Sequence, residues 1–169
     1  QDDSVTGITT MMTDAGIDTG DILLQQEVSI TADATTGSLL ETLSQVGADL
    51  MMETVRLLEA GECPRTPQNQ DQMTYDPMLK KEMGRMEFTH PARALACQVR
   101  AMNPWPCAYV QLANGDLKVW MAQQAAVQKQ AEPGMVLAAD AKQGLIVSTG
   151  SGALELTEIQ APNSKRMTA

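Results

Sequence analysis

The sequence has few of the residues that bind metals, form disulfides or stack on nucleic-acid bases. It contains one histidine, His90, and three cysteines without C-x-x-C spacing, so we expect neither a zinc site nor a disulfide framework. Reduced thiols are typical of a cytoplasmic protein, and we expect that compartment. Because aromatic residues make up only 3% of the chain, Trp105, which lies between two prolines, is better explained as a packing anchor than as a base-stacking residue.

The sequence also lacks an apolar run long enough to cross a bilayer, and it does not open with the segments of a signal peptide. We therefore expect no membrane association. Positive charge is scarce in the first part of the chain: the net charge is −9, and residues 1–62 contain a single basic side chain, Arg56. Because a surface that binds nucleic acid needs lysines and arginines facing the phosphates, any such surface must be a patch in the second part.

The 169 residues, 43% of them apolar, are sufficient for one domain or two small ones. Apolar runs predict strands over residues 5–12 and 21–30. The pattern Ser38-x-x-Glu41 is a capping box that opens a long amphipathic helix, and Gly61 is its predicted stop. We expect this helix to pack on the sheet to which the two strands belong.

A change in composition marks a linker over residues 62–80. This segment contains three prolines, many side-chain amides and almost no periodic apolar positions. Extended segments of this kind usually run over a surface, and Tyr75 and Leu79 offer apolar anchors for it. The alternative is a disordered segment.

The remaining residues, 81–169, combine one helix with several short strands. The helix is predicted over residues 91–102, with Thr89 or His90 as its N-cap. It stops before Pro104, because a proline disfavours helical geometry in the preceding residue. Several short strands after a single helix predict a small β-barrel. The predicted strands cover residues 108–112, 117–121, 136–139, 144–148 and 153–160, and the first two are joined through Asn114-Gly115.

The connection between the first two predicted strands is an acidic loop that holds Asp14, Asp18 and Asp21. Gly16 and Gly20 can supply the positive φ angles that a tight connection needs. Asp18 is therefore held at a fixed point at the end of buried strands, where α/β proteins often carry chemistry. From the residues alone, a turn whose aspartates cap backbone N–H groups is the favoured alternative. We expect no metal site here, although a loop that binds a hard cation stays open.

Four blocks of the sequence, in the same order, resemble the methionyl-tRNA formyltransferase family. Residues 6–24 are similar to the family pattern TGVT-x-M-x-M-D-x-G-L-D-T-G-D-I-L, and residues 100–109 (RAMNPWPCAY) are similar to R-A-x-N-P-W-P-G-A-Y. Residues 75–85 (YDPMLKKEMGR) and 165–167 (KRM) extend the resemblance over nearly the whole chain.

The resemblance implies an α/β piece followed by an all-β domain. Residues 1–61 would be the C-terminal part of a Rossmann-like formyltransferase catalytic domain, residues 62–80 the interdomain linker, and residues 81–169 an OB-like barrel that binds tRNA. The implied enzyme transfers a formyl group from 10-formyltetrahydrofolate to the α-amine of methionyl initiator tRNA in translation initiation. The resemblance further implies a monomeric full-length protein that does not bind DNA.

The family builds its active site from an Asn, a His and an Asp, and Asp18 matches that Asp. The Asn and the His lie upstream, with the glycine-rich half that holds the formyl-folate, and His90 falls in a poorly matched stretch. We therefore expect this chain to be the C-terminal part of the enzyme, inactive alone and without a bound cofactor or metal. The resemblance makes Asp14 and Asp21 structural caps.

Contacts to tRNA are expected from basic residues of the second part. Exposed lysines are usually only solvated, so each residue is a weak candidate by itself. The chain also departs from the family pattern at Cys107, where glycine is usual, and at Met78, where many relatives carry lysine. The candidates are Lys80, Lys81, Arg85, Arg100, Lys165 and Arg166.

Two other functions stay open. A sugar-nucleotide formyltransferase shares the aspartate loop and a related Pro-Trp-Pro segment, but Asn103 and the ending at residues 165–167 favour the tRNA enzyme. A non-catalytic RNA-binding module is the alternative from another class. An upstream Asn-x-His motif would support the enzyme over the module.

Overall fold

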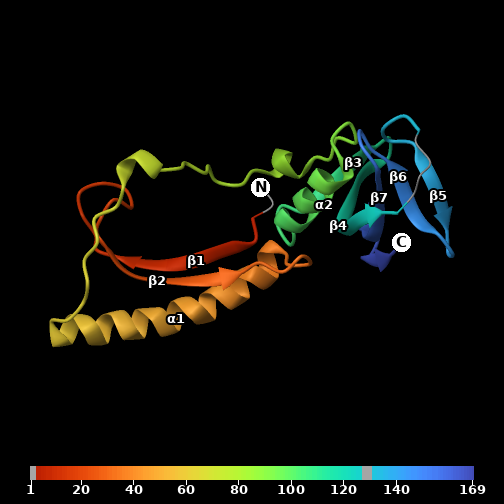
Figure 1. Cartoon of the computed structure of the whole chain (residues 1–169). Coiled ribbons are helices and arrows are strands. Elements are labelled where there is room, and N and C mark those ends of the chain that lie inside the picture. Colours follow the sequence, from red (N-terminus) through yellow and green to blue (C-terminus); the bar gives the residue numbers. More distant parts are fainter. Residues whose placement is uncertain (1–2, 127–130) are drawn as a thin grey trace. The chain divides into compact units, whose positions relative to one another are not determined.

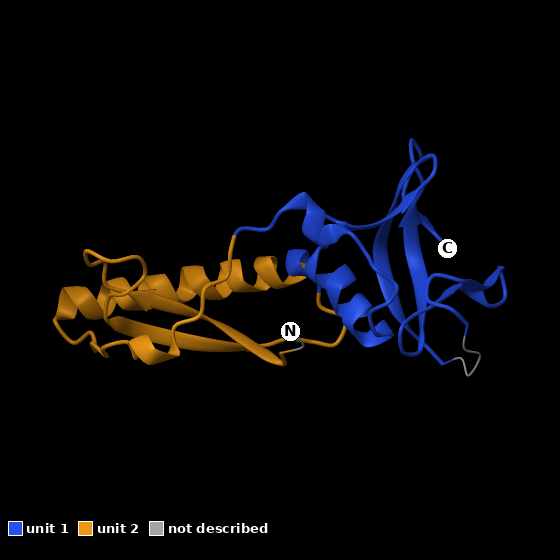
Figure 2. Cartoon of the chain, turned by 90° about the horizontal axis from the view of Figure 1, so that it is seen from above, with its two compact units in different colours: residues 1, 35–37, 78–169 blue, residues 2–34, 38–77 orange. Residues whose placement is uncertain are grey.

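The computed structural model describes residues 3–126 and 131–169. These residues form two compact units, which Figure 2 shows in orange and blue. The N-terminal unit comprises residues 3–34 and 38–77, and the C-terminal unit comprises residues 35–37 and 78–169.

The sheet of the N-terminal unit is an antiparallel pair of strands, β1 (Val5–Met11) and β2 (Ile22–Ser29), shown in Figure 1. The register pairs Thr10 with Leu24, and an irregularity follows between Thr10 and Met11. Both strand predictions are confirmed. Because the two strands are consecutive and antiparallel, the acidic loop connects them at one end of the pair.

Helix α1 (Thr36–Ala60) follows β2, and the prediction of a long helix here is confirmed. The predicted capping box is wrong, because the helix begins at Thr36 and Ser38 already lies within its first turn. The helix ends in a Schellman motif, in which the N–H groups of Gly61 and Glu62 donate to carbonyls of the last turn at 3.1 and 2.9 Å. Gly61 has a φ of 71°, which only glycine adopts readily. The predicted stop at Gly61 is therefore confirmed with its mechanism.

A buried pair of hydroxyl groups joins α1 to β1. Thr54 Oγ1 donates to the Leu50 carbonyl at 2.8 Å and lies 2.8 Å from Thr10 Oγ1. Both threonines are buried. This pairing confirms that α1 packs on the sheet, while other apolar side chains of the helix stay at least 42% exposed, namely Leu40, Met51, Met52, Val55 and Leu58.

The segment predicted as a linker contacts the N-terminal unit through polar groups. Thr66 and Ile22 exchange two backbone hydrogen bonds of 2.8 and 2.9 Å and form an isolated β-bridge. A short 3-10 turn, η1 (Gln70–Gln72), follows. Tyr75 is 83% exposed and Leu79 is 39% exposed, so the prediction that Tyr75 anchors the segment is wrong. The backbone pairing of Thr66 with Ile22, and not burial of Tyr75, connects the segment to the N-terminal unit.

The C-terminal unit is a six-stranded antiparallel sheet with one helix packed on it, a β-barrel-like arrangement that confirms the predicted fold class. The strands are β3 (Ala108–Leu112), β4 (Gly115–Ala125), β5 (Val136–Asp140), β6 (Gly144–Ser148), β7 (Ala153–Gln160) and β8 (Met167–Thr168). Their order is β3-β4-β7-β6-β5, and β8 also pairs with β7. The five strand predictions are confirmed. Strand β8 has two residues and was not predicted, because so short a segment has no readable alternation.

Helix α2 (Ala92–Ala101) supplies the core of this unit from one side and is preceded by the 3-10 turn η2 (Lys81–Gly84). Leu95 and Val99 are at most 1% exposed, and they belong to one cluster with Val119 and Leu154 of the sheet. The helix prediction is confirmed. Within the described residues, no helix is long and apolar enough to cross a membrane.

The predicted N-cap of α2 is wrong. Pro91 holds the N-cap position, and no side chain caps the helix there. Ala92 N–H instead donates to the carbonyl of Ser151 at 3.0 Å, and His90 N–H donates to the carbonyl of Glu87. Because the loop before β7 supplies an acceptor from the backbone, the helix start does not depend on a side chain of Thr89 or His90.

Candidate functional site

The acidic loop between β1 and β2 is closed at its base by the backbone. Met12 N–H donates to the carbonyl of Asp21 at 2.9 Å. A Cβ atom at Gly20 would lie 1.8 Å from the Met12 carbonyl oxygen, so only glycine fits where the two arms of the loop cross. The hydrogen bond between Met12 and Asp21 and the close approach at Gly20 therefore fix both ends of the loop.

Asp14 organises the first half of the loop. Its Oδ1 atom accepts hydrogen bonds from the backbone N–H of Gly16 at 3.0 Å and from the hydroxyl of Thr19 at 2.7 Å. This is the capping function that was predicted for Asp14. For Asp21, only the backbone carbonyl is engaged in a described hydrogen bond, and its role as a side-chain cap stays a prediction.

Asp18 lies at the turn of the loop with its carboxylate exposed. Its φ is 54°, a left-handed conformation that aspartate and asparagine tolerate better than most residues. Within the described part of the chain, the carboxylate makes no hydrogen bond and no ion pair. It is thus a charged group on a fixed backbone, available to a ligand.

An open hollow of about 510 Å³ lies beside Asp18. Its polar groups are one carboxylate, two side-chain amides and one hydroxyl, and two apolar side chains complete it. The hollow is lined by Thr9, Met11, Asp18, Ile22, Gln25 and Gln68. All of these residues belong to the N-terminal unit, so the hollow is a property of that unit alone.

Gln68 connects the linker segment to the loop. Its side-chain amide donates to the backbone carbonyl oxygens of Asp18 at 2.9 Å and Gly20 at 2.7 Å. Its Nε2 atom also lies 3.8 Å from the sulfur of Met11. Sequence reasoning missed this residue, because an amide in a proline-rich segment gives no signal of a partner 50 residues earlier.

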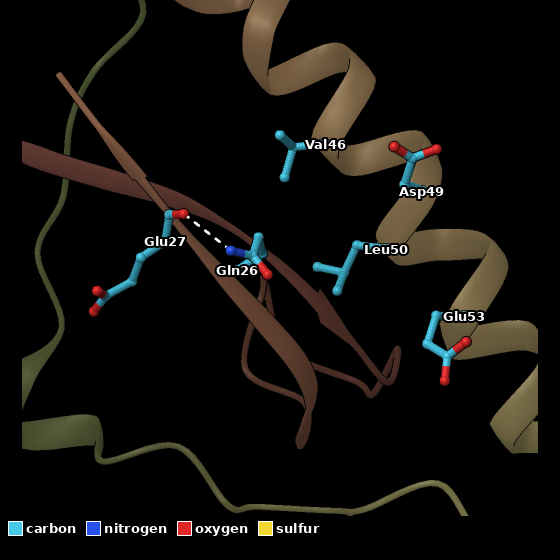
Figure 3. Close-up of a pocket in the computed structure, with 6 residues that line it drawn as sticks. All are labelled: Gln26, Glu27, Val46, Asp49, Leu50 and Glu53. Carbon is cyan, nitrogen blue, oxygen red and sulfur yellow. Dashed lines mark hydrogen bonds between the residues drawn. The ribbon is translucent and has the colours of Figure 1, made fainter. Parts of the chain in front are cut away.

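A second hollow, of about 370 Å³, lies between β2 and α1 (Figure 3). Its carboxylates belong to Glu27, Asp49 and Glu53, and Figure 3 shows them spread around the rim. The amide of Gln26 donates to the Glu27 carbonyl at 3.1 Å. No group of three or more His, Cys, Asp or Glu side chains in the described ranges could hold a metal ion, so neither this hollow nor the acidic loop has the geometry of a metal centre.

Two sequence profiles match the chain in succession. The profile described as formyl transferase matches residues 1–55, and the profile described as formyl transferase, C-terminal domain, matches residues 78–169. The chain belongs to the formyl transferase family.

Curated relatives of the chain confirm the resemblance seen in its sequence. The methionyl-tRNA formyltransferase of Agathobacter rectalis is 41% identical over 165 residues, which are 98% of this chain and 53% of that protein. The methionyl-tRNA formyltransferase of Symbiobacterium thermophilum is 42% identical over 168 residues, which are 99% of this chain and 52% of that protein. The chain thus spans about half the length of the curated relatives it matches.

A solved structure shows the same fold. HypX from Aquifex aeolicus in complex with tetrahydrofolic acid superposes with a TM-score of 0.70 over 98% of this chain and 29% of its own length. The two sequences are 18% identical, so the likeness extends to the fold alone.

The basic residues that the sequence suggests for RNA contact all lie in the C-terminal unit. Lys80 precedes turn η2, which contains Lys81, and Arg85 follows it; all three are exposed. Arg100 lies in the last turn of α2, where its Nη2 atom is 3.4 Å from the Cys97 sulfur. Lys165 is exposed just before β8.

Arg166 is held in place by an acidic side chain and an aromatic ring. Its Nε atom donates to Glu158 Oε2 at 2.7 Å, and its Nη2 atom contacts the same oxygen. The guanidinium lies 4.8 Å from the ring centroid of Trp120, a cation–π geometry. Trp120 Nε1 in turn donates to Gln160 Oε1 at 3.1 Å. Sequence reasoning did not single out Trp120, since its partners lie on β7 and beyond.

Cys107 shows why the family pattern has glycine at this position. Its φ is 71°, in the left-handed region that glycine adopts without strain. The side chain is 2% exposed, and its thiol donates to the carbonyl of Val119 at 3.6 Å. Burial raises the pKa of the Cys107 thiol, against the opposing effects of Lys118 and Arg166.

Proposed function

We propose that this chain is the C-terminal part of a methionyl-tRNA formyltransferase that acts in the cytoplasm. The enzyme would transfer a formyl group from 10-formyltetrahydrofolate to the α-amine of methionine on initiator tRNA. The observation that carries the proposal is the exposed carboxylate of Asp18, on a loop that Gln68 holds through two hydrogen bonds, in a chain about 40% identical to enzymes of that name over nearly its whole length.

Asp18 is the proposed catalytic residue on this chain. Formyl transfer to an amine needs an unprotonated nitrogen, a polarised carbonyl and a stabilised tetrahedral oxyanion. Asp18 would orient a histidine and assist removal of the amine proton. The Asn and His that the resemblance implies would come from the preceding half of the enzyme and would stabilise the oxyanion.

The hollow beside Asp18 suits the reacting end of a formyl donor. The amide of Gln25 and the hydroxyl of Thr9 can hydrogen-bond to neutral polar atoms, and Met11 and Ile22 provide apolar walls. These residues carry no positive charge, so they do not suit the acidic end of a folate. We infer that residues of the preceding half would hold the rest of the co-substrate.

We further propose the division into a catalytic piece over residues 1–61, a linker over residues 62–80 and a tRNA-binding domain over residues 81–169. Residues 1, 2 and 127–130 of these ranges lie outside the described residues. The compact unit that starts at residue 78 supports a boundary within the proposed linker. The proposed tRNA contacts are Lys80, Lys81, Arg85, Arg100, Lys165 and Arg166.

The test uses the full-length enzyme with Asp18→Asn. Asparagine preserves the shape of the side chain and tolerates the left-handed backbone, so the substitution removes only the charge. We expect kcat for formylation of initiator tRNA to fall by about 10²–10⁴-fold, the usual contribution of a positioned acid or base. Steady-state assays with 10-formyltetrahydrofolate measure this.

Asp71→Asn is the matched control. It removes the same charge from the same unit, at an exposed position in turn η1 outside the hollow, and we expect kcat to stay unchanged. Full activity of Asp18→Asn would contradict the catalytic role. Formylation of an amino-sugar nucleotide in place of methionyl-tRNA by the unmodified enzyme would contradict the substrate.

A further inference from the structure

The carboxamide of Gln68 is committed to the loop that carries Asp18. An amide nitrogen has two N–H donors, and here two backbone carbonyls accept them, those of Asp18 at 2.9 Å and Gly20 at 2.7 Å. Because both partners are acceptors only, the nitrogen and not the oxygen must face the loop. The side chain therefore holds two backbone positions at once, on either side of Thr19.

The segment that delivers Gln68 is itself fixed. Thr66, two residues earlier, exchanges two backbone hydrogen bonds with Ile22 at the start of β2. Asn69, the next residue, caps turn η1 by accepting from the N–H of Asp71 at 3.1 Å. Gln68 thus projects from a short stretch of ordered backbone whose position is set by the same strand that the acidic loop enters.

The other hydrogen bonds of the loop do not engage the backbone carbonyls of Asp18 and Gly20. Asp14 holds Gly16 and Thr19, and the pair of Met12 with Asp21 closes the base. In the described part of the chain, no other side chain bonds to the carbonyls of residues 18 and 20. Asp18 has a left-handed backbone, which costs more for a residue with a Cβ than for glycine, so hydrogen bonds from Gln68 to the neighbouring carbonyls help to hold it there.

We propose that Gln68 is a positioning residue for Asp18. It fixes the backbone of residues 18–20 and so aims the Asp18 carboxylate into the hollow that both residues line. The inference rests on the proposed function for its catalytic consequence, but the positioning itself is independent of that function. Gln68 touches no reacting atom in this role.

The first test measures the loop directly in the full-length protein. Gln68→Met keeps the length of the side chain and removes both donors. We expect amide hydrogen exchange in the segment spanning residues 12–21 to accelerate by about 10-fold, because loop opening no longer has to break two hydrogen bonds. Gln72→Met is the matched control, since Gln72 is an exposed glutamine of the same segment with no side-chain bond to the loop, and it leaves the exchange unchanged. Unchanged exchange in Gln68→Met would overturn the proposal.

The second test asks whether Gln68 acts through Asp18. Gln68→Met should lower kcat about 10- to 100-fold, as expected when a reacting group is misplaced, and change KM less. In an Asp18→Asn background, the same change should lower kcat by less than about 2-fold, since there is no longer a charge to position.

The outcomes separate the two claims. Equal losses of kcat from Gln68→Met in both backgrounds would overturn positioning through Asp18. Faster exchange in the loop with no effect of Asp18→Asn on kcat would overturn the proposed catalytic function and leave the structural tie intact. If Gln68→Met lowers thermal stability and accelerates exchange throughout the molecule as much as in the loop, Gln68 has a general structural role. That result would also overturn the proposal.

Discussion

At the scale of single residues, burial decides the reactivity of the cysteines. The thiol of Cys107 is 2% exposed and its pKa is raised by burial, whereas Cys63 is half-buried in the connecting segment. Because the thiolate is the reactive form, we expect iodoacetamide at neutral pH to modify Cys63 at least about 10-fold faster than Cys107. Peptide mass spectrometry of the native full-length protein measures both rates. Equal rates would show that the strand pair around Cys107 opens readily.

The sequence predicts a residue of the candidate site only where neighbouring residues in the sequence define its position. Asp18 lies between two glycines and two apolar strands, so its place at a loop tip is readable within a few residues. Gln68 is not readable, because its partners are backbone carbonyls 50 residues away and any nearby amide of the segment has the same local appearance. Trp120 was not predicted for the same reason, since the pairing of β8 with β7 brings Arg166 to it from a distant part of the sequence.

At the scale of elements, the hydroxyl pair between α1 and β1 should stabilise the N-terminal unit. Thr54→Val keeps the shape of the side chain but removes the partner of the buried Thr10 hydroxyl. We expect it to lower the free energy of opening α1 by about 1–2 kcal/mol, the cost of a lost buried hydrogen bond. Hydrogen exchange of the α1 amides in the full-length protein measures this.

Thr42→Val is the matched control for this prediction. Its hydroxyl donates to the backbone carbonyl of Ser38 on the exposed side of the same helix at 3.2 Å, so the change should alter the opening free energy by less than about 0.5 kcal/mol. Equal effects of the two substitutions would indicate that the loss reflects the helix propensity of valine and not the pairing with Thr10.

Helices and strands were predicted well wherever apolar residues recur at a regular spacing or a residue type that ends a helix is present. The strands and both helices follow from apolar spacing, and Gly61 ends α1 with the left-handed conformation that its residue type allows. The predicted N-cap of α2 failed because the acceptor for Ala92 comes from Ser151, which is distant in sequence. Local capping rules cannot include an acceptor that tertiary packing supplies.

At the scale of the whole molecule, the distribution of charge limits where this chain could contact the proposed tRNA partner. The net charge is −9, and the first 62 residues hold one basic side chain, so within this chain the proposed phosphate contacts would come from basic residues of the C-terminal unit. Acidic neighbours compete for these residues. Arg166 is the clearest case, since Glu158 already accepts from two of its nitrogens.

Arg166 can contact RNA only through the guanidinium N–H donors that Glu158 does not engage. A guanidinium has five N–H donors, and Glu158 engages two of its three nitrogens, which leaves donors for a phosphate while Trp120 holds the group in place. We expect Arg166→Gln in the full-length enzyme to weaken binding of initiator tRNA and to reduce the slope of log K against log salt by about 1. Filter binding at several KCl concentrations measures both.

Lys142→Gln is the charge-matched control, because Lys142 lies in the turn between β5 and β6 and is not among the proposed contacts. It should leave the slope unchanged. Glu158→Gln should tighten binding several-fold if the carboxylate competes with phosphate for Arg166. An unchanged slope in Arg166→Gln, together with lower thermal stability, would instead make Arg166 a structural partner of Trp120, and the proposed tRNA contacts of this chain would then be the other five basic residues.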